Sequence, residues 1–253
     1  TMTDEEQLDV IKCIVDTVNK RIPVIAGAST NDTRHSLSLA KGAQDMGADA
    51  LLIITPYYNK ANRTGLKAHF KAIADAVDLP IILYNVPSRT GVNIAPDLVA
   101  ELANECKNIV AIKEASGDIA QVAEVARLVP DDFAIYSGND DSITPLLSLG
   151  GSGVISVLAN VCPRQTHDLV AKFLDGDVKG SCKIQLDLKA LIDALFIEVN
   201  PVPVKTALNL LGFEVGHLRL PLGEMNPKNL EVLKQELINA GLDVKQTAEL
   251  GVK

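Results

Sequence analysis

The stretch Ile109-Val-Ala-Ile-Lys-Glu-Ala-Ser-Gly117 decides the fold, because four apolar residues lead directly into two charged ones. A short apolar run that ends in polar residues and glycine is typical of a strand buried on both faces of a parallel sheet. We therefore expect a strand over residues 109–114, with Lys113 close to its carboxyl end.

Apolar runs of the same kind recur on both sides of this stretch. They are Ile22–Ala26, Ala50–Thr55, Ile81–Asn85, Phe133–Ser137 and Val154–Leu158. Helical patterns fill the intervals: Thr3 and Glu6 form a capping box before an apolar stripe, and Pro96 suits a first helical turn. Strands that alternate with helices at this interval predict parallel βαβ units. Six units in a row favour a barrel over an open sheet.

The pattern changes after residue 163, where only helices are indicated. Asn226-Pro227 opens the last clear helix and Gly241 closes it. We therefore predict an α/β protein whose residues 1–163 form a (β/α) barrel portion with six strands. Residues 164–253 are expected to form a barrel-completing helix and a C-terminal helical extension.

Composition narrows the possible partners. Hydrophobic residues make up 47% of the 253 positions, but aromatic residues only 4%, so we expect an aliphatic core. The net charge of −8 argues against nucleic acid or an anionic membrane as a partner. No run approaches the roughly 20 apolar residues of a membrane span. The cysteines lack metal spacing and no basic-then-apolar leader opens the chain, so we expect a cytoplasmic protein.

Polar residues gather at the predicted strand ends. The runs end in TPYYN (55–59), YNVPSRTG (84–91), IKEASG (112–117) and SGND (137–140). Parallel α/β folds place their sites at the carboxyl ends of the strands, so this convergence predicts one site.

Lys113 and Tyr84 are the candidates for covalent and proton-transfer chemistry. A lysine at the end of an apolar strand is partly desolvated, which favours the neutral amine that condenses with a ketone to an imine. The alternative is a lysine that simply reaches solvent, the commoner situation. A phenol at Tyr84 would shuttle protons for imine formation, or would only pack at the rim.

The other strand-end residues are open to two interpretations each. The planar fork of Arg89 suits a carboxylate, although a surface ion pair explains it equally well. Tyr57 and Tyr58 form an amphipathic pair that suits an oligomer contact. The segment Ser137-Gly-Asn-Asp140 is either a backbone nest for an anion or a polar turn.

Other chemistries find no support in the sequence. The four histidines show no metal-ligand spacing, and no zinc-protease motif or pair of strand-end carboxylates occurs. The phosphate-binding and dinucleotide-binding glycine fingerprints are also missing. We therefore expect neither a metal nor another cofactor.

Together with GVISV (153–157) and Pro201-Val-Pro-Val-Lys205, these motifs resemble those of the dihydrodipicolinate synthase family, in the same order along the whole chain. The resemblance implies a TIM-type (β/α)8 barrel that condenses pyruvate with aspartate 4-semialdehyde on the route to lysine and diaminopimelate. It also implies a homo-oligomer, either a dimer or a tetramer.

The resemblance assigns roles to individual residues. Lys113 resembles the lysine that forms the imine with pyruvate, and Tyr84 the central tyrosine of a proton relay. Tyr58 resembles the tyrosine that crosses a tight dimer interface to complete the relay of the neighbouring subunit. Arg89 resembles the arginine that receives the carboxylate of aspartate semialdehyde. The backbone positions implied to line the pyruvate pocket are Gly138 and Ile155.

The sequence also departs from the family pattern. The family's chain begins with two further strands, and the second ends in a Gly-Thr-Thr-Gly-Glu loop just before the position that corresponds to Thr1. We therefore expect six barrel strands here, without the relay threonine of that loop, and a reduced turnover.

Two other functions stay open at this point. The first is that of a sibling lyase that cleaves N-acetylneuraminate or a 2-keto-3-deoxy sugar acid with the same lysine and tyrosine. Arg89 favours the synthase, because it offers a cation to a carboxylated aldehyde. The second is that of a non-catalytic scaffold or truncated variant, which the missing loop supports.

Overall fold

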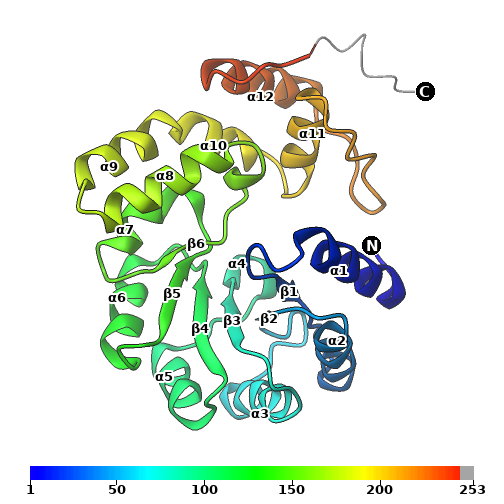
Figure 1. Ribbon diagram of the computed structural model, residues 1–253, viewed down its shortest axis with the longest axis vertical. Coiled ribbons are helices and arrows are strands. Elements are labelled where there is room, and N and C mark those ends of the chain that lie inside the picture. The colour runs from blue at the N-terminus through cyan, green and yellow to red at the C-terminus, as the bar shows by residue number, and fades with distance from the viewer. Residues whose placement is uncertain (246–253) are drawn as a thin grey trace. The chain divides into compact units, whose positions relative to one another are not determined.

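A computed structural model of the chain describes residues 1–245 and shows strands alternating with helices before a run of helices (Figure 1). The described chain divides into two units. The sheet unit comprises residues 2–138 and 148–153, and the helical unit comprises Thr1, residues 139–147 and the chain from residue 154 onward. The predicted division at residue 163 is a different one and stays a prediction.

The strands follow one another across a single sheet in chain order. They are β1 (Ile25–Gly27), β2 (Ala50–Ile54), β3 (Ile81–Asn85), β4 (Ile109–Glu114), β5 (Ala134–Ser137) and β6 (Gly153–Val154). Each strand from β1 to β4 pairs in parallel with the next, as the sequence pattern predicted. A parallel pair needs a crossover connection, which the intervening helices supply. The α/β class and the TIM-type arrangement with six strands are confirmed.

Five helices of the sheet unit pack in chain order along one side of the strands (Figure 1). They are α1 (Asp4–Val18), α2 (Thr33–Asp45), α3 (Arg63–Ala74), α5 (Pro96–Glu105) and α6 (Ile119–Leu128), whereas the short helix α4 (Pro87–Thr90) directly follows β3. The predicted capping box is present, because Thr3 Oγ1 accepts from the backbone of Glu6 while Glu6 accepts from the backbone of Thr3. Pro96 opens α5 as predicted.

The first strand begins later than predicted. The expected strand over Ile22–Ala26 is wrong at its start, because β1 begins at Ile25. Ile22 is 64% exposed, and Pro23 has no N–H group to donate to a neighbouring strand.

The last strand ends earlier than predicted. Only Val154 of the expected strand Val154–Leu158 is in β6, and Leu158 begins the short helix η2 (Leu158–Asn160). The Asp140 carboxylate accepts the backbone N–H groups of Val157 and Leu158 at 3.0 and 2.8 Å. These two hydrogen bonds satisfy backbone N–H groups at the start of the helix. In a strand, the same groups would bond to a neighbouring strand.

The helical unit confirms that helices follow residue 163 in the part that the structure describes. Its helices are η1 (Asp140–Ser142), α7 (Ile143–Leu147), η2, α8 (Pro163–Leu174), α9 (Val178–Asp187), α10 (Lys189–Leu195), α11 (Val202–Leu210) and α12 (Pro227–Asn239). Asn226 caps α12 through its side chain, and Gly241 has a φ of 78° just beyond the helix. Its core is aliphatic, with Leu195, Leu233 and Leu237 fully buried.

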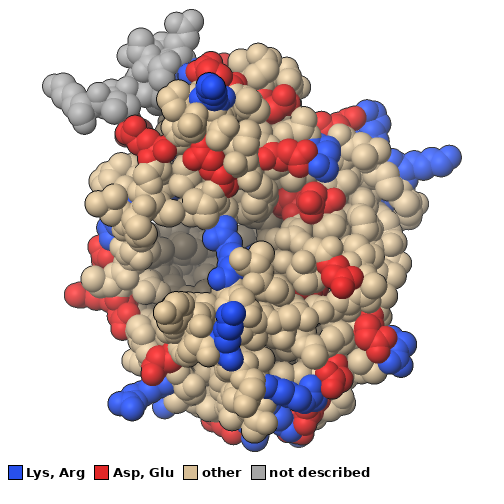
Figure 2. Space-filling view, turned by 180° about the vertical axis from the view of Figure 1, so that it is seen from behind, with Lys and Arg blue, Asp and Glu red and all other residues tan. Residues whose placement is uncertain are grey.

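Two observations concern the surface of the described residues. No helix among residues 1–245 has both the length and the apolar character needed to cross a bilayer. On the face that Figure 2 shows, basic and acidic side chains lie interspersed.

His69 of α3 is a buried titratable side chain. It is 4% exposed, its Nδ1 atom lies 2.9 Å from Thr33 Oγ1, and its Nε2 atom is buried without a hydrogen-bond partner among the described residues. Burial lowers the pKa of His69, and the charge of Asp32 opposes this only in part. The folded protein therefore holds this ring neutral where the unfolded chain would bind a proton.

We expect the free energy of unfolding to fall as the pH is lowered below about 6.5, the usual pKa of an exposed histidine. The reason is that the unfolded state then binds one proton more than the folded state. Chemical unfolding at a series of pH values measures this slope. The slope should be smaller in His69→Gln, whereas the control His217→Gln alters an exposed histidine. An equal loss of slope in both variants would contradict the assignment.

Candidate active site at the carboxyl ends of the strands

Tyr84 and Lys113 lie side by side on neighbouring strands. They are direct partners in the parallel pairing of β3 with β4. The Lys113 Nζ atom lies 4.2 Å from the centroid of the Tyr84 ring. The face of an aromatic ring attracts a cation, so this geometry stabilises a positive charge on that nitrogen. The structure thus brings together the two residues that the sequence singled out for covalent and proton-transfer chemistry.

The Tyr84 phenol is held in its protonated form. Burial raises the pKa of Tyr84, and the positive charge of Arg89 lowers it by a smaller amount. A neutral phenol beside an amine is able to donate a proton to a leaving hydroxyl group. The effect of Arg89 also shows that its guanidinium acts electrostatically on the same region.

The backbone of Gly138 packs tightly beside Lys113 and leaves no room for a side chain. A Cβ atom at this position would lie 2.5 Å from Ala115 Cβ and 3.1 Å from Lys113 Cε. The backbone N–H of Gly138 donates to the Glu114 carbonyl at 2.7 Å, which holds the chain after β5 against the end of β4. The predicted pocket position therefore lies beside the predicted nucleophile.

Arg89 is presented by the short helix α4, directly after β3. Pro87 begins this helix, and Gly91 ends it with a φ of 72°, a conformation that suits glycine. The Thr90 hydroxyl accepts from the Val92 backbone, which fixes the loop behind the arginine. Arg89 itself is exposed at the rim, as a residue that meets an incoming anion should be.

Tyr58 lies exposed on the loop that follows β2. It is 90% exposed and has a φ of 72°, an uncommon conformation for a residue with a side chain. The loop is held by Asn31, whose side chain donates to the Tyr57 carbonyl and whose carbonyl accepts from the Asn59 side chain at 2.8 Å. The described contacts of Tyr58 include neither Tyr84 nor Lys113.

Of the remaining predicted positions, Ile155 and Asp140 belong to the helical unit. Ile155 is half-buried there, and its role stays a prediction. The segment Ser137-Gly-Asn-Asp140 runs from β5 into η1, and Asp140 uses its carboxylate to accept the backbone N–H groups near η2. For Asp140 the polar-turn interpretation agrees better with this contact than an anion-binding nest does.

The sequence analysis missed a buried pair on the same two strands. Glu114 and Asn85 are 2% and 0% exposed, and they follow Lys113 and Tyr84 directly in the chain. The only available signal was a carboxylate placed inside an apolar strand, where charged residues are rare unless they are paired.

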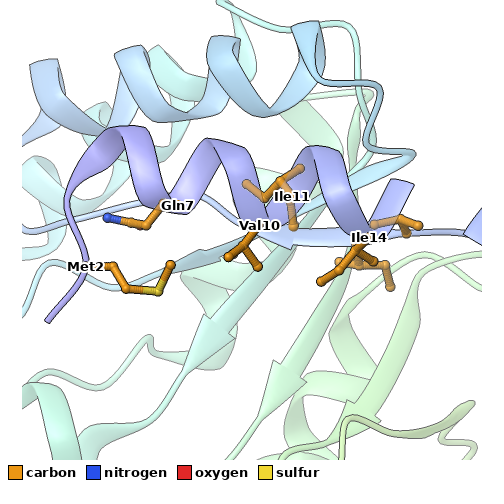
Figure 3. A pocket seen from close by; sticks show the side chains of 9 residues that line it. Met2, Gln7, Val10, Ile11 and Ile14 are labelled. Atoms are coloured by element: carbon orange, nitrogen blue, oxygen red, sulfur yellow. The ribbon is translucent and has the colours of Figure 1, made fainter. Parts of the chain in front are cut away.

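A cavity elsewhere in the sheet unit is a poor candidate for chemistry. It has a volume of about 340 Å³ and lies between α1 and β1 (Figure 3). It is lined by Met2, Gln7, Val10, Ile11, Ile14, Val24, Ile25, Ala26 and Gly27. This lining is apolar apart from Gln7 and contains no titratable side chain, so it cannot transfer protons. Within residues 1–245 no cluster of three or more metal-ligating side chains is found, and the expected lack of a metal stays a prediction.

Comparison with known proteins agrees with the geometry. Residues 1–240 match the dihydrodipicolinate synthetase family. The chain belongs to this family. A 4-hydroxy-tetrahydrodipicolinate synthase from Acetivibrio thermocellus is 59% identical over 242 residues, which cover 96% of this chain and 82% of the relative.

Solved structures of the family resemble the chain closely. Dihydrodipicolinate synthase from Aquifex aeolicus superposes with a TM-score of 0.95 at 43% identity, covering 97% of this chain and 84% of that one. The chloride-inhibited enzyme from Acinetobacter baumannii, solved in complex with pyruvate, gives a TM-score of 0.93 at 43% identity, covering 96% and 83%. The fold of the family is therefore shared over nearly the whole of this chain.

We expect Gly138→Ala to destabilise this family member by about 1–3 kcal/mol, because the added methyl group overpacks the contact with Ala115 and Lys113. Urea unfolding measures the change. Gly223→Ala is the matched control, since a Cβ atom there meets no heavy atom within 4 Å. If the two variants were equally stable, the tight packing beside Lys113 would be refuted.

Proposed function

We propose that this chain condenses pyruvate with aspartate 4-semialdehyde in lysine and diaminopimelate biosynthesis, as a 4-hydroxy-tetrahydrodipicolinate synthase. The observation that carries the proposal is the placement of the Lys113 amine over the Tyr84 ring, with the backbone of Gly138 packed closely beside the lysine. Family membership and the relatives named as synthases support the same reaction. A relative solved with pyruvate supports the first substrate.

The proposed reaction begins at the Lys113 nitrogen. Its lone pair attacks the ketone carbon of pyruvate, and the resulting carbinolamine loses its hydroxyl group as water with a proton from Tyr84. The product is a protonated imine whose positive charge withdraws electrons from the adjacent methyl group. The Tyr84 phenolate then takes up a methyl proton, which gives an enamine. The enamine carbon attacks the aldehyde of the second substrate, so that the protonated imine re-forms and the aldehyde oxygen takes up a proton. The imine is itself the electron sink, so the proposal needs no metal.

The second substrate and the assembly follow from two exposed residues. Arg89 is proposed to bind the carboxylate of the semialdehyde, because its guanidinium lies at the rim near Tyr84. Tyr58 is proposed to act in the site of a second copy in a homo-oligomer. An aromatic side chain that is 90% exposed on a loop held by hydrogen bonds suits such a contact.

Borohydride should trap one pyruvate adduct on Lys113, because reduction of the protonated imine makes the new carbon–nitrogen bond permanent. Intact mass and peptide mapping give the number and position of adducts. Lys113→Ala should abolish the adduct. An adduct on another lysine would refute the role of Lys113. Failure of any adduct to form would favour a non-catalytic protein.

Arg89→Ala should raise the KM for the semialdehyde by roughly ten- to a hundredfold, the effect of one lost charge-assisted hydrogen bond. Pyruvate trapping should change little, because it does not use this carboxylate. Steady-state kinetics with each substrate varied in turn measure the difference. Arg63→Ala is the control, since Arg63 is an arginine that pairs with Asp97 and Glu101 on the neighbouring helix α5. Equal damage to both substrates would show that Arg89 is structural. Cleavage of a sugar acid instead would favour the sibling lyases.

A further inference from the structure

A buried carboxylate lies directly behind the reactive pair. Glu114 and Asn85 are partners in the pairing of β4 with β3, one position beyond Lys113 and Tyr84. Asn85 Nδ2 donates to both carboxylate oxygens of Glu114, at 3.2 and 3.0 Å. Because side chains alternate along a strand, this bond spans the two strands on the face opposite to Lys113.

Glu114 also holds the segments that follow both strands. Its Oε1 atom accepts the Ser116 backbone N–H at 2.7 Å, and its Oε2 atom accepts from the Gln121 side chain at 3.2 Å. Asn85 in turn accepts the Ile94 backbone N–H at 3.0 Å. The Glu114 carboxylate therefore connects the ends of two strands with the turn after Lys113 and with the start of α6.

Neutral donors make all of these contacts. Among the described residues no lysine or arginine pairs with Glu114, and each hydrogen bond is donated to it, as an ionised carboxylate requires. A buried charge of this kind contributes little to stability compared with an apolar pair of the same volume. It does restrict geometry, because every donor must point at the same two oxygens.

We propose that Glu114 is a positioning residue for the reaction at Lys113. By joining Asn85 to Ser116, it fixes the ends of β3 and β4 so that the Lys113 amine lies over the Tyr84 ring. The inference rests on the proposed function of Lys113 and adds a residue that does not touch the substrate. The reactive side chains lie on one face of the strand pair, and the bond that aligns them lies on the other.

Glu114→Gln is the direct test. A glutamine presents an NH₂ group to neighbours that are themselves donors, so at least one of the bonds is lost. The rate of pyruvate-adduct formation at saturating pyruvate should fall on the order of tenfold or more, as expected for a misplaced reactive group. The pH profile for labelling of Lys113 by 1-fluoro-2,4-dinitrobenzene should shift as well, because the surroundings of its amine change.

A matched control removes hydrogen bonds at the other end of the same strand. Asn108 precedes β4 and donates to the carbonyls of Ala74 and Val77 at 3.0 and 3.1 Å. Asn108→Ala should destabilise the protein and leave the adduct rate and the labelling profile of Lys113 close to wild type. If both variants lowered the rate in proportion to their loss of stability, Glu114 would be merely structural and the proposal would be overturned.

An exchanged pair tests whether the bond itself matters. In Asn85→Asp with Glu114→Gln the carboxylate and the amide change places, so the bond across the strands is kept. This double variant should regain part of the adduct rate that Glu114→Gln loses, and no recovery would overturn the proposal. If Glu114→Gln does not fold, Gln121→Leu removes one donor only and should shift the labelling profile in the same direction. An unchanged profile there would also overturn it.

The two proposals can fail separately. If the wild-type protein formed no adduct on Lys113, the proposed function would be refuted. Labelling by the dinitrobenzene reagent needs no pyruvate, so it still decides whether Glu114 sets the surroundings of Lys113.

Discussion

The pairing register of β3 with β4 is the constraint on which the candidate site depends. The pairing is irregular at one point: Ile81 is opposite Ile109, but Ile82 is opposite Ala111, so Val110 has no partner. Without this extra residue Tyr84 would lie opposite Ile112. An extra residue of this kind shifts the rest of the strand by one position, and side chains alternate with a period of two. The irregularity therefore places the tyrosine opposite the lysine.

The same register gives the strand pair two different faces at its carboxyl end. Tyr84 and Lys113 form one pair, and Asn85 and Glu114 form the other. The first pair is half-buried and presents an amine and a phenol, whereas the second is fully buried and hydrogen-bonded. A slip by one residue would exchange the two faces and bury the amine. Fixing the register is thus equivalent to fixing which groups are available for chemistry.

The parts of the fold that local pattern determines could be predicted from the sequence. The bounds of β3 and β4 agree with the apolar runs, because each strand has buried residues on both of its faces and hardly any polar residue interrupts it. The predicted bounds of β1 and β6 were less accurate, because Pro23 and the Asp140 carboxylate alter the backbone pairing at those places. Lys113 and Tyr84 could be found because their chemistry is unusual at the end of an apolar strand.

The residues that position Lys113 could not be predicted from the sequence in the same way. Asn85 and Glu114 are 29 positions apart, and asparagine and glutamate at strand ends are equally typical of ordinary turns. Nothing in the local pattern says that Val110 lacks a partner, because that property belongs to two strands together. The residue type alone can indicate a reactive side chain. A positioning contact, in contrast, exists only once two segments that are distant in the sequence are paired. In a parallel sheet, the register of strand pairing decides which positioning contacts form. Here the unpaired residue Val110, four positions before the end of β4, sets the register of β3 with β4.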